Sequence, residues 1–185
     1  MMNHIDLSSV LRQTVACDLY SNLVTRPTGA AVRDQIERLL GDAHDRTLTV
    51  IDFSQVSMID FSCADEVIAK LLLRYEADNP PREAYFLFRG VTEEHWEAIE
   101  AVLERRGLAL VLEQADGIHV VGTLSADERR VWEMARRLGR AATLELAEAL
   151  GAPAADVQRA LDALRRRRLV MRSGDEYVVV GSYRG

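Results

Sequence analysis

The order of the predicted elements changes near Gly122, and this change constrains the fold more than any other feature of the sequence. Up to Gly122, strand-like and helical stretches alternate, which is typical of α/β sheets. After Gly122, three helical stretches follow one another and a β-hairpin ends the chain. The charge changes at the same place, from a balance of −9 over residues 1–123 to +3 over residues 124–185. We therefore predict two domains, 1–123 and 124–185.

Apolar periodicity and turn residues predict the elements of the front domain. The predicted strands are residues 16–24, 48–53, 85–88, 108–113 and 118–121. The predicted helices are residues 27–40, 61–75 and 92–107. The pair Asp116-Gly117 favours a tight turn between the last two strands, so we expect the sheet to end with an antiparallel hairpin.

The sequence carries no sign of a membrane span or of an export signal. Its longest apolar runs are strand-sized, far below the roughly 20 residues that a membrane helix needs. The stretch from Met1 to Asp6 has neither a basic start nor a long apolar segment. We therefore expect a cytoplasmic protein that makes no membrane contact.

Residues that could support catalysis or metal binding are scattered. Cys17 and Cys63 are far apart, so they indicate buried thiols and not a disulfide framework or a zinc site. The four histidines lack a second ligand at helical spacing, and no glycine-rich phosphate loop follows a predicted strand. Ser62, Cys63 and Asp60 are neighbours, but no activating histidine stands at a recognisable spacing. We expect no metal, no cofactor and no enzymatic activity.

The stretch from Val50 to Leu71, VIDFSQVSMIDFSCADEVIAKL, resembles the core of the sulfate-transporter/anti-sigma-antagonist (STAS) family, in which a strand runs through a serine-bearing turn into a helix. It is most similar to the STAS-like variant of unknown function found in bacterial signalling proteins, through Asp52-Phe53-Ser54 and Ala64-Asp65-Glu66. The segment Leu23-Val-Thr-Arg26 resembles a short signature of the same variant. The resemblance covers residues 5–122 and implies a mixed sheet packed with helices.

The STAS resemblance implies a partner-binding surface around Ser62, made of Asp60, Phe61, Cys63 and Asp65. In anti-sigma-factor antagonists, a partner kinase phosphorylates a serine at this helix start, and the phosphate controls binding to an ATPase-fold anti-sigma factor. A second interpretation is that Ser62 and Asp65 form a capping box with no further role. Asp65 and Glu66 also place two negative charges in the first turn, where we expect them to repel a phosphate.

The back domain resembles the winged helices of bacterial transcription regulators. Ser125 and Glu128 form a capping box that begins a helix ending at Gly139. A second helix ends at Gly151 and a third starts at Pro153, at the spacing of a helix-turn-helix. Two short strands, residues 169–173 and 176–180, complete the winged-helix pattern.

In such regulators the third helix enters the major groove of double-stranded DNA. On this helix we expect Gln158 and Arg159 to read bases, with Arg165 and Arg166 near phosphates, although basic residues at a helix end also serve the helix dipole. Asp156 and Asp162 oppose DNA binding because phosphates repel them.

Two functions therefore remain open. In the first, the chain is a bacterial transcription regulator in which the STAS-like domain controls a DNA-binding winged helix. In the second, it is a signalling adaptor of the anti-sigma-antagonist type whose winged helix binds protein. Both are compatible with a homodimer, because helix-turn-helix proteins often read two half-sites as dimers.

Overall fold

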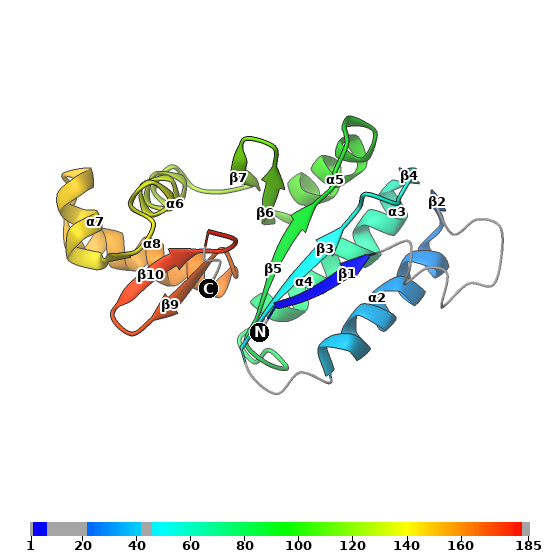
Figure 1. Ribbon diagram of the computed structural model, residues 1–185, viewed down its shortest axis with the longest axis horizontal. Helices are drawn as coiled ribbons and strands as arrows, with labels where there is room; N and C mark the ends of the chain where they lie inside the picture. The colour runs from blue at the N-terminus through cyan, green and yellow to red at the C-terminus, as the bar shows by residue number, and fades with distance from the viewer. Residues whose placement is uncertain (1, 7–21, 42–45, 183–185) are drawn as a thin grey trace.

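The computed structural model describes residues 2–6, 22–41 and 46–182, with side chains described from residue 22 onward (Figure 1). Within these residues, a five-stranded sheet has the order β1-β3-β5-β6-β7. Its strands are β1 (Met2–Asp6), β3 (Thr47–Asp52), β5 (Ala84–Arg89), β6 (Ala109–Gln114) and β7 (Gly117–Gly122). Neighbouring strands are parallel up to β6, whereas β6 and β7 form an antiparallel hairpin. The predicted α/β class is confirmed.

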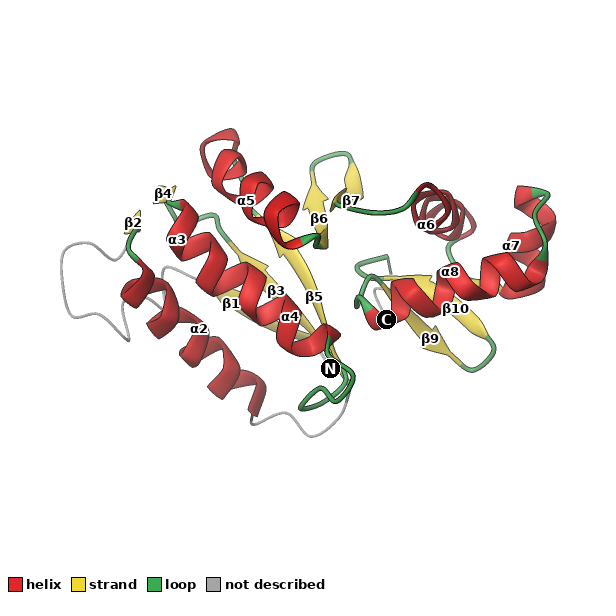
Figure 2. Cartoon of the chain, turned by 180° about the vertical axis from the view of Figure 1, so that it is seen from behind, coloured by secondary structure: helices red, strands yellow, loops and turns green. Residues whose placement is uncertain are grey.

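Three helical segments cover one face of this sheet, as seen from behind in Figure 2. They are α2 (Arg26–Gly41), a central helix made of α3 (Phe61–Ala64), the π-helical turn η1 (Asp65–Ala69) and α4 (Lys70–Glu76), and α5 (Glu93–Arg106). Alternate strand residues, such as Ile51, Phe86 and Leu110, point into the core beneath these helices. A separate pair of short parallel strands, β2 (Asn22–Leu23) and β4 (Met58–Ile59), lies before α2 and α3.

The carboxy-terminal part contains three helices and a small sheet. The helices are α6 (Ala126–Leu138), α7 (Thr143–Leu150) and α8 (Ala154–Arg166). The strands β8 (Ala141–Ala142), β9 (Val170–Ser173) and β10 (Glu176–Val179) pair in the order β8-β10-β9. The predicted capping box is confirmed, because the Ser125 hydroxyl accepts the Glu128 amide while the Glu128 carboxylate accepts the Ser125 amide. Trp132 is fully buried, and its indole N–H donates to the Leu169 carbonyl.

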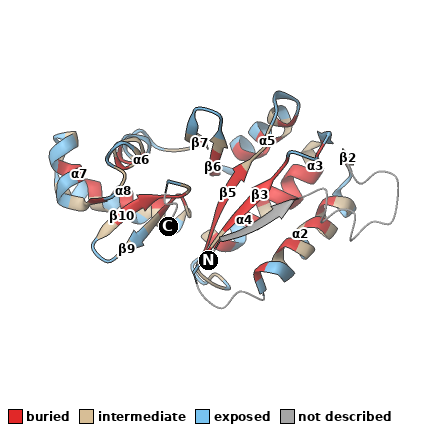
Figure 3. Ribbon diagram, in the orientation of Figure 1, coloured by how far each residue is buried: buried red, intermediate tan, exposed pale blue. Residues whose placement is uncertain are grey.

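The second face of the five-stranded sheet packs against the carboxy-terminal part. Its alternate residues, including Val50, Tyr85 and Leu87, share one apolar core with Trp132 and Leu161. The central strands β3, β5 and β6 are therefore buried on both faces (Figure 3), as their largely apolar sequences require.

Two arginines that follow α8 strengthen this interface with polar contacts. Arg167 pairs with Glu128 and donates to the carbonyls of Gly107 and Thr123. Arg168 donates to the Tyr75 carbonyl and places its guanidinium over the Tyr85 ring. The end of α8 is thus bound to both the central helix and the sheet.

Some details of the prediction differ from the structure. The predicted strand at 16–24 is represented by Asn22–Leu23, and its earlier residues lie outside the described ones. Strand β1 was not predicted, and the predicted helix 61–75 contains a π-helical turn. In the part of the chain that the structure describes, no helix is long and apolar enough to cross a membrane.

Candidate protein-interaction site around Ser62

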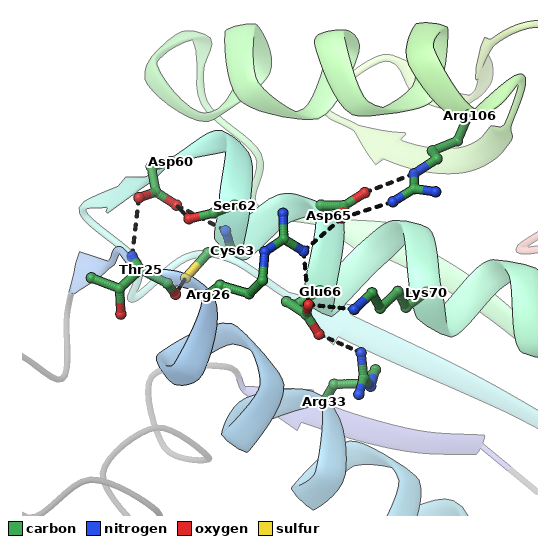
Figure 4. Close-up of polar contacts among 10 residues, drawn as sticks. All are labelled: Thr25, Arg26, Arg33, Asp60, Ser62, Cys63, Asp65, Glu66, Lys70 and Arg106. Atoms are coloured by element: carbon green, nitrogen blue, oxygen red, sulfur yellow. Dashed lines mark hydrogen bonds and ion pairs between the residues drawn. The ribbon is translucent and has the colours of Figure 1, made fainter.

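Asp60 organises the start of the central helix (Figure 4). Its Oδ1 accepts the Cys63 amide at 2.8 Å and the Ser62 hydroxyl at 2.9 Å. Its Oδ2 accepts the Thr25 amide at 3.0 Å, which ties this turn to the segment before α2. Burial acts to raise the pKa of Asp60, but the hydrogen bonds from Cys63, Thr25 and Ser62 outweigh it and lower the pKa. Asp60 is therefore a helix-capping carboxylate that stays ionised.

Thr25 is held in an unfavourable backbone conformation next to this turn. Its φ is 71°, in the left-handed region that a β-branched residue rarely adopts. Its amide donates to Asp60, and its carbonyl accepts the Cys63 thiol at 2.8 Å, so contacts with α3 stabilise the strained residue. Strain of this kind persists where the surroundings fix it and is concentrated at functional sites. Here it sets the position of the next residue, Arg26.

Two acidic side chains are buried in the π-helical turn. Asp65 and Glu66 are 1% and 2% exposed, respectively. Arg106 of α5 contacts both oxygens of Asp65, at 2.9 and 3.0 Å, and Arg26 donates to the same carboxylate at 2.8 Å. Hydrogen bonds from Arg106 dominate over burial and lower the pKa of Asp65.

Glu66 is surrounded in the same way from the other side. It accepts Arg26 at 2.8 Å, and Arg33 and Lys70 at 2.5 Å each. Burial acts to raise its pKa, but these cations outweigh it and lower the pKa. Arg26 therefore bridges both carboxylates, and side chains from α2, the central helix and α5 meet at one point (Figure 4).

The structure shows that the charges of Asp65 and Glu66, which we expected to repel an anion at Ser62, are paired with cations. Both carboxylates are buried, and four cationic side chains contact them. The cations are more exposed than the acids: the side chains of Arg26, Lys70 and Arg106 are 47%, 42% and 39% exposed. The exposed members of this network are therefore its cations.

The residues of the predicted partner surface differ in how far they are buried. Ser62 and Phe61 are half-buried, and the Arg105 guanidinium lies 5.5 Å above the Phe61 ring. Ser62 does not cap the helix as a capping box with Asp65; Asp60 is the cap, and Ser62 donates to it. Cys63 and Asp65 are buried, so they do not lie on an exposed surface as predicted.

The local chemistry does not favour nucleophilic catalysis. Burial raises the pKa of the Cys63 thiol to about 12, so the thiol stays protonated and donates to Thr25. Asp60, whose pKa is lowered, is a poor base for Ser62. Among the described residues, no group of three or more His, Cys, Asp or Glu side chains is placed to hold a metal ion.

The predicted DNA-contacting residues lie on or near α8 but differ in their surroundings. Gln158 accepts the Thr143 hydroxyl and donates to both Asp162 and the Tyr177 hydroxyl. Arg159 is 79% exposed and lies 3.5 Å from Asp156. Arg165 is half-buried near Tyr85, whereas Arg166 is exposed.

Carboxylates outnumber arginines on the outward surface of α7 and α8. Four acidic side chains are exposed there: Glu145, Glu148, Asp156 and Asp162. The exposed arginines of these two helices are Arg159 and Arg166. At the tip of the β9–β10 hairpin, Asp175 is fully exposed and pairs with Arg172. This surface is therefore net acidic.

Sequence reasoning did not find the network of Arg26, Arg33, Lys70 and Arg106. Two features of the sequence could have indicated this network: the Leu23–Arg26 segment and the helical spacing of Glu66 and Lys70.

Comparison of the chain with protein-family models, with curated proteins and with solved structures gave no match. The case for a function therefore rests on the geometry and charge of the described residues.

Proposed function

We propose that this chain is a non-enzymatic bacterial signalling adaptor with two protein-binding surfaces. Its STAS-like domain, residues 1–123, binds a protein partner beside Ser62. Its winged-helix domain, residues 124–185, binds protein and not DNA. The order of helix, short strand, two helices and hairpin from Ala126 to Val179 supports the winged-helix assignment. The passage from β3 through a serine-bearing turn into α3 supports the STAS-like assignment.

The acidic outward surface of α7 and α8 carries the preference for protein. Binding of a helix in the major groove depends on lysine and arginine contacts to phosphates, and carboxylates at the same surface oppose it. Asp156 and Asp162 flank Arg159 on α8, and Gln158 is already engaged within the domain. Leu144, at 74% exposed, gives this surface an apolar anchor of the kind that protein partners cover.

At the other surface, Ser62 is suited to act as a switch. Its hydroxyl donates to Asp60, so phosphorylation by a partner kinase would remove this hydrogen bond and place a charge of nearly −2 beside a carboxylate. The helix start would have to rearrange or bind a cation to accommodate it. A partner of the ATPase-fold kinase or anti-sigma-factor type would then distinguish the two forms of the protein.

DNA binding is the second candidate, because α8 carries an exposed arginine. The Arg159 side chain is 79% exposed. The two candidates are separated by selection from random duplex DNA with the full chain, followed by anisotropy titrations between 50 and 300 mM salt. The adaptor requires no enriched sequence. An enriched duplex whose binding weakens with salt and with Arg159→Ala would establish the DNA-binding regulator instead.

A direct test of the protein-binding surface uses a photo-crosslinking amino acid at position 144 in cells. We expect adducts of defined mass at this position. The control places the same amino acid at Arg130, an exposed position on α6. Equal labelling at both positions, or none at 144, would refute a specific protein-binding role for the outward surface of α7 and α8.

A further inference from the structure

Four cations surround two carboxylates in the network beneath Ser62, and we call Arg26, Arg33, Lys70 and Arg106 the cationic shell. With Asp65 and Glu66 included, the set carries a net charge of +2. The surrounding front domain is acidic overall, with a balance of −9 over residues 1–123. The shell is thus a positive spot on a negative domain.

Toward the residues that the structure describes, the shell keeps unused hydrogen-bond donors. Among these contacts, Arg26 uses Nη1 to bridge Asp65 and Glu66, which leaves Nε and Nη2, and Arg33 likewise uses Nη1. Lys70 uses one of its three N–H groups. Because the buried carboxylates hold these cations in place, their free donors are already ordered, which lowers the entropy cost of binding an anion.

We infer that the cationic shell binds a carboxylate-rich segment of the protein partner, next to Ser62. This inference rests on the proposed function and adds the chemistry of the partner. Arginine guanidinium groups bind carboxylates through paired N–H groups, so the free Nε and Nη2 of Arg26 form one such site. The strained Thr25 and the π-helical turn fix the shell in place, and both features are enriched at functional sites.

The neighbouring charges select a narrow acidic segment over a nucleic acid. The domain around the shell has a charge balance of −9 over residues 1–123, and α5, the helix that carries Arg106, also exposes Glu97, Glu100 and Glu104 on its other side. A duplex, which is broad and uniformly anionic, would bring its phosphates near the carboxylates of this acidic domain. A short extended peptide can place its acidic side chains on the shell and avoid them.

The test is an NMR titration of the intact, ¹⁵N-labelled chain with a peptide of eight glutamates and, separately, a peptide of eight glutamines. We expect the glutamate peptide to shift the Nε–Hε signals of Arg26 and Arg33 and the amide signals near residues 62 to 70. The glutamine peptide should leave them in place. If the glutamate peptide shifts no signal of the shell, or if both peptides act equally, the inference is overturned.

A matched set of variants tests the same point by affinity. The double variant Arg33→Gln, Lys70→Gln removes two charges and leaves Arg26 to pair with Glu66. We expect it to bind labelled glutamate peptide at least tenfold more weakly, while the double variant Arg130→Gln, Arg137→Gln, which removes two exposed charges on α6, changes binding less than twofold. Equal weakening by both variants would mean that overall charge, and not the shell, attracts the peptide. Thermal unfolding of each variant confirms that it is folded.

This result can be separated from the outcome for the adaptor role. DNA selection and crosslinking at Leu144 test the carboxy-terminal surface, which lies on other helices. If the shell binds glutamate peptide and the protein also binds a specific DNA sequence, the inference about the shell holds and the adaptor role is refuted. If the shell binds no glutamate peptide but position 144 crosslinks to a protein and no DNA is selected, the adaptor role holds and the inference is refuted.

Discussion

We predict that burial of Glu76 makes the stability of this protein depend on pH near neutrality. It is the last residue of α4, beside the Tyr75 carbonyl that accepts Arg168 from the carboxy-terminal part. Its Oε1 is buried and has no hydrogen-bond partner in the described structure. Burial, with a smaller contribution from Glu128, raises its pKa from 4.5 to about 7, although Arg167 and Arg168 oppose the shift.

The sign and size of the effect follow from this shift. The folded chain holds the Glu76 proton more tightly than the unfolded chain, so the stabilisation is fully present below pH 4.5 and is lost as the pH rises through 7. A rise from 4.5 to about 7 corresponds to at most about 3.4 kcal/mol, at about 1.36 kcal/mol per pKa unit. Because the side chain is partly exposed to solvent, we expect about 1–2 kcal/mol.

The perturbation is Glu76→Gln, which keeps the shape of the protonated side chain and removes its charge at every pH. Urea unfolding at pH 8.5 should show the variant to be about 1–2 kcal/mol more stable than the natural protein. At pH 5 the two should agree within about 0.5 kcal/mol. Glu97→Gln, at an exposed position on α5, is the control and should change the free energy of unfolding by the same small amount at pH 5 and at pH 8.5. A Glu76→Gln variant that is no more stable at pH 8.5 would refute the reasoning.

Three further predictions concern single side chains. Arg168→Ala should lower the free energy of unfolding by about 1–2 kcal/mol in urea, because it removes the bond to Tyr75 and the contact with the Tyr85 ring; an unchanged midpoint would contradict this role. Asp65→Asn should cost about 1.5–3 kcal/mol in the same assay, because Arg106 and Arg26 lose their hydrogen bonds to a charged carboxylate; a neutral result would mean that these ion pairs contribute little. Iodoacetamide at pH 8 should label Cys63 slowly in the folded chain and rapidly in urea, because the thiol is buried and its pKa is raised to about 12. Peptide mass spectrometry measures the labelling, and rapid labelling of the folded chain would mean that this site opens readily.

Elements with a local signal were predictable from sequence. Strand β5 has an unbroken apolar run from Ala84 to Phe88, and α6 has both a capping box and an apolar stripe, so neither needs distant partners to be recognised. Strand β1 was missed because Met2 to Asp6 is short and has neither a continuous apolar run nor a regular alternation of polar and apolar residues. It is a strand because it pairs in parallel with β3, more than 40 residues away.

The candidate site was predictable only at its centre. The serine-bearing turn marked Asp60 to Asp65, since these residues are consecutive in the chain. The cations that neutralise Asp65 come from other helices, and the partner on α5, Arg106, is 41 residues away. No local pattern specifies a pairing across such a distance. The burial of Asp65 and Glu66 was missed for the same reason, because isolated acidic residues at a helix start are normally exposed.

The central helix connects the two proposed binding regions of the molecule. Its first turn carries Ser62, and its last turn carries Tyr75 and Glu76, which face Arg168 at the end of α8. Packed helices move as units, so a partner that binds differently to two positions of this helix must also act on the contacts at its other end. The π-helical turn lies between these ends, where the buried carboxylates fix the helix to α2 and α5. Coupling between the Ser62 surface and the carboxy-terminal helices therefore requires the partner's binding free energy to differ between the two positions of the helix by an amount comparable to what this ion network contributes to holding it in place.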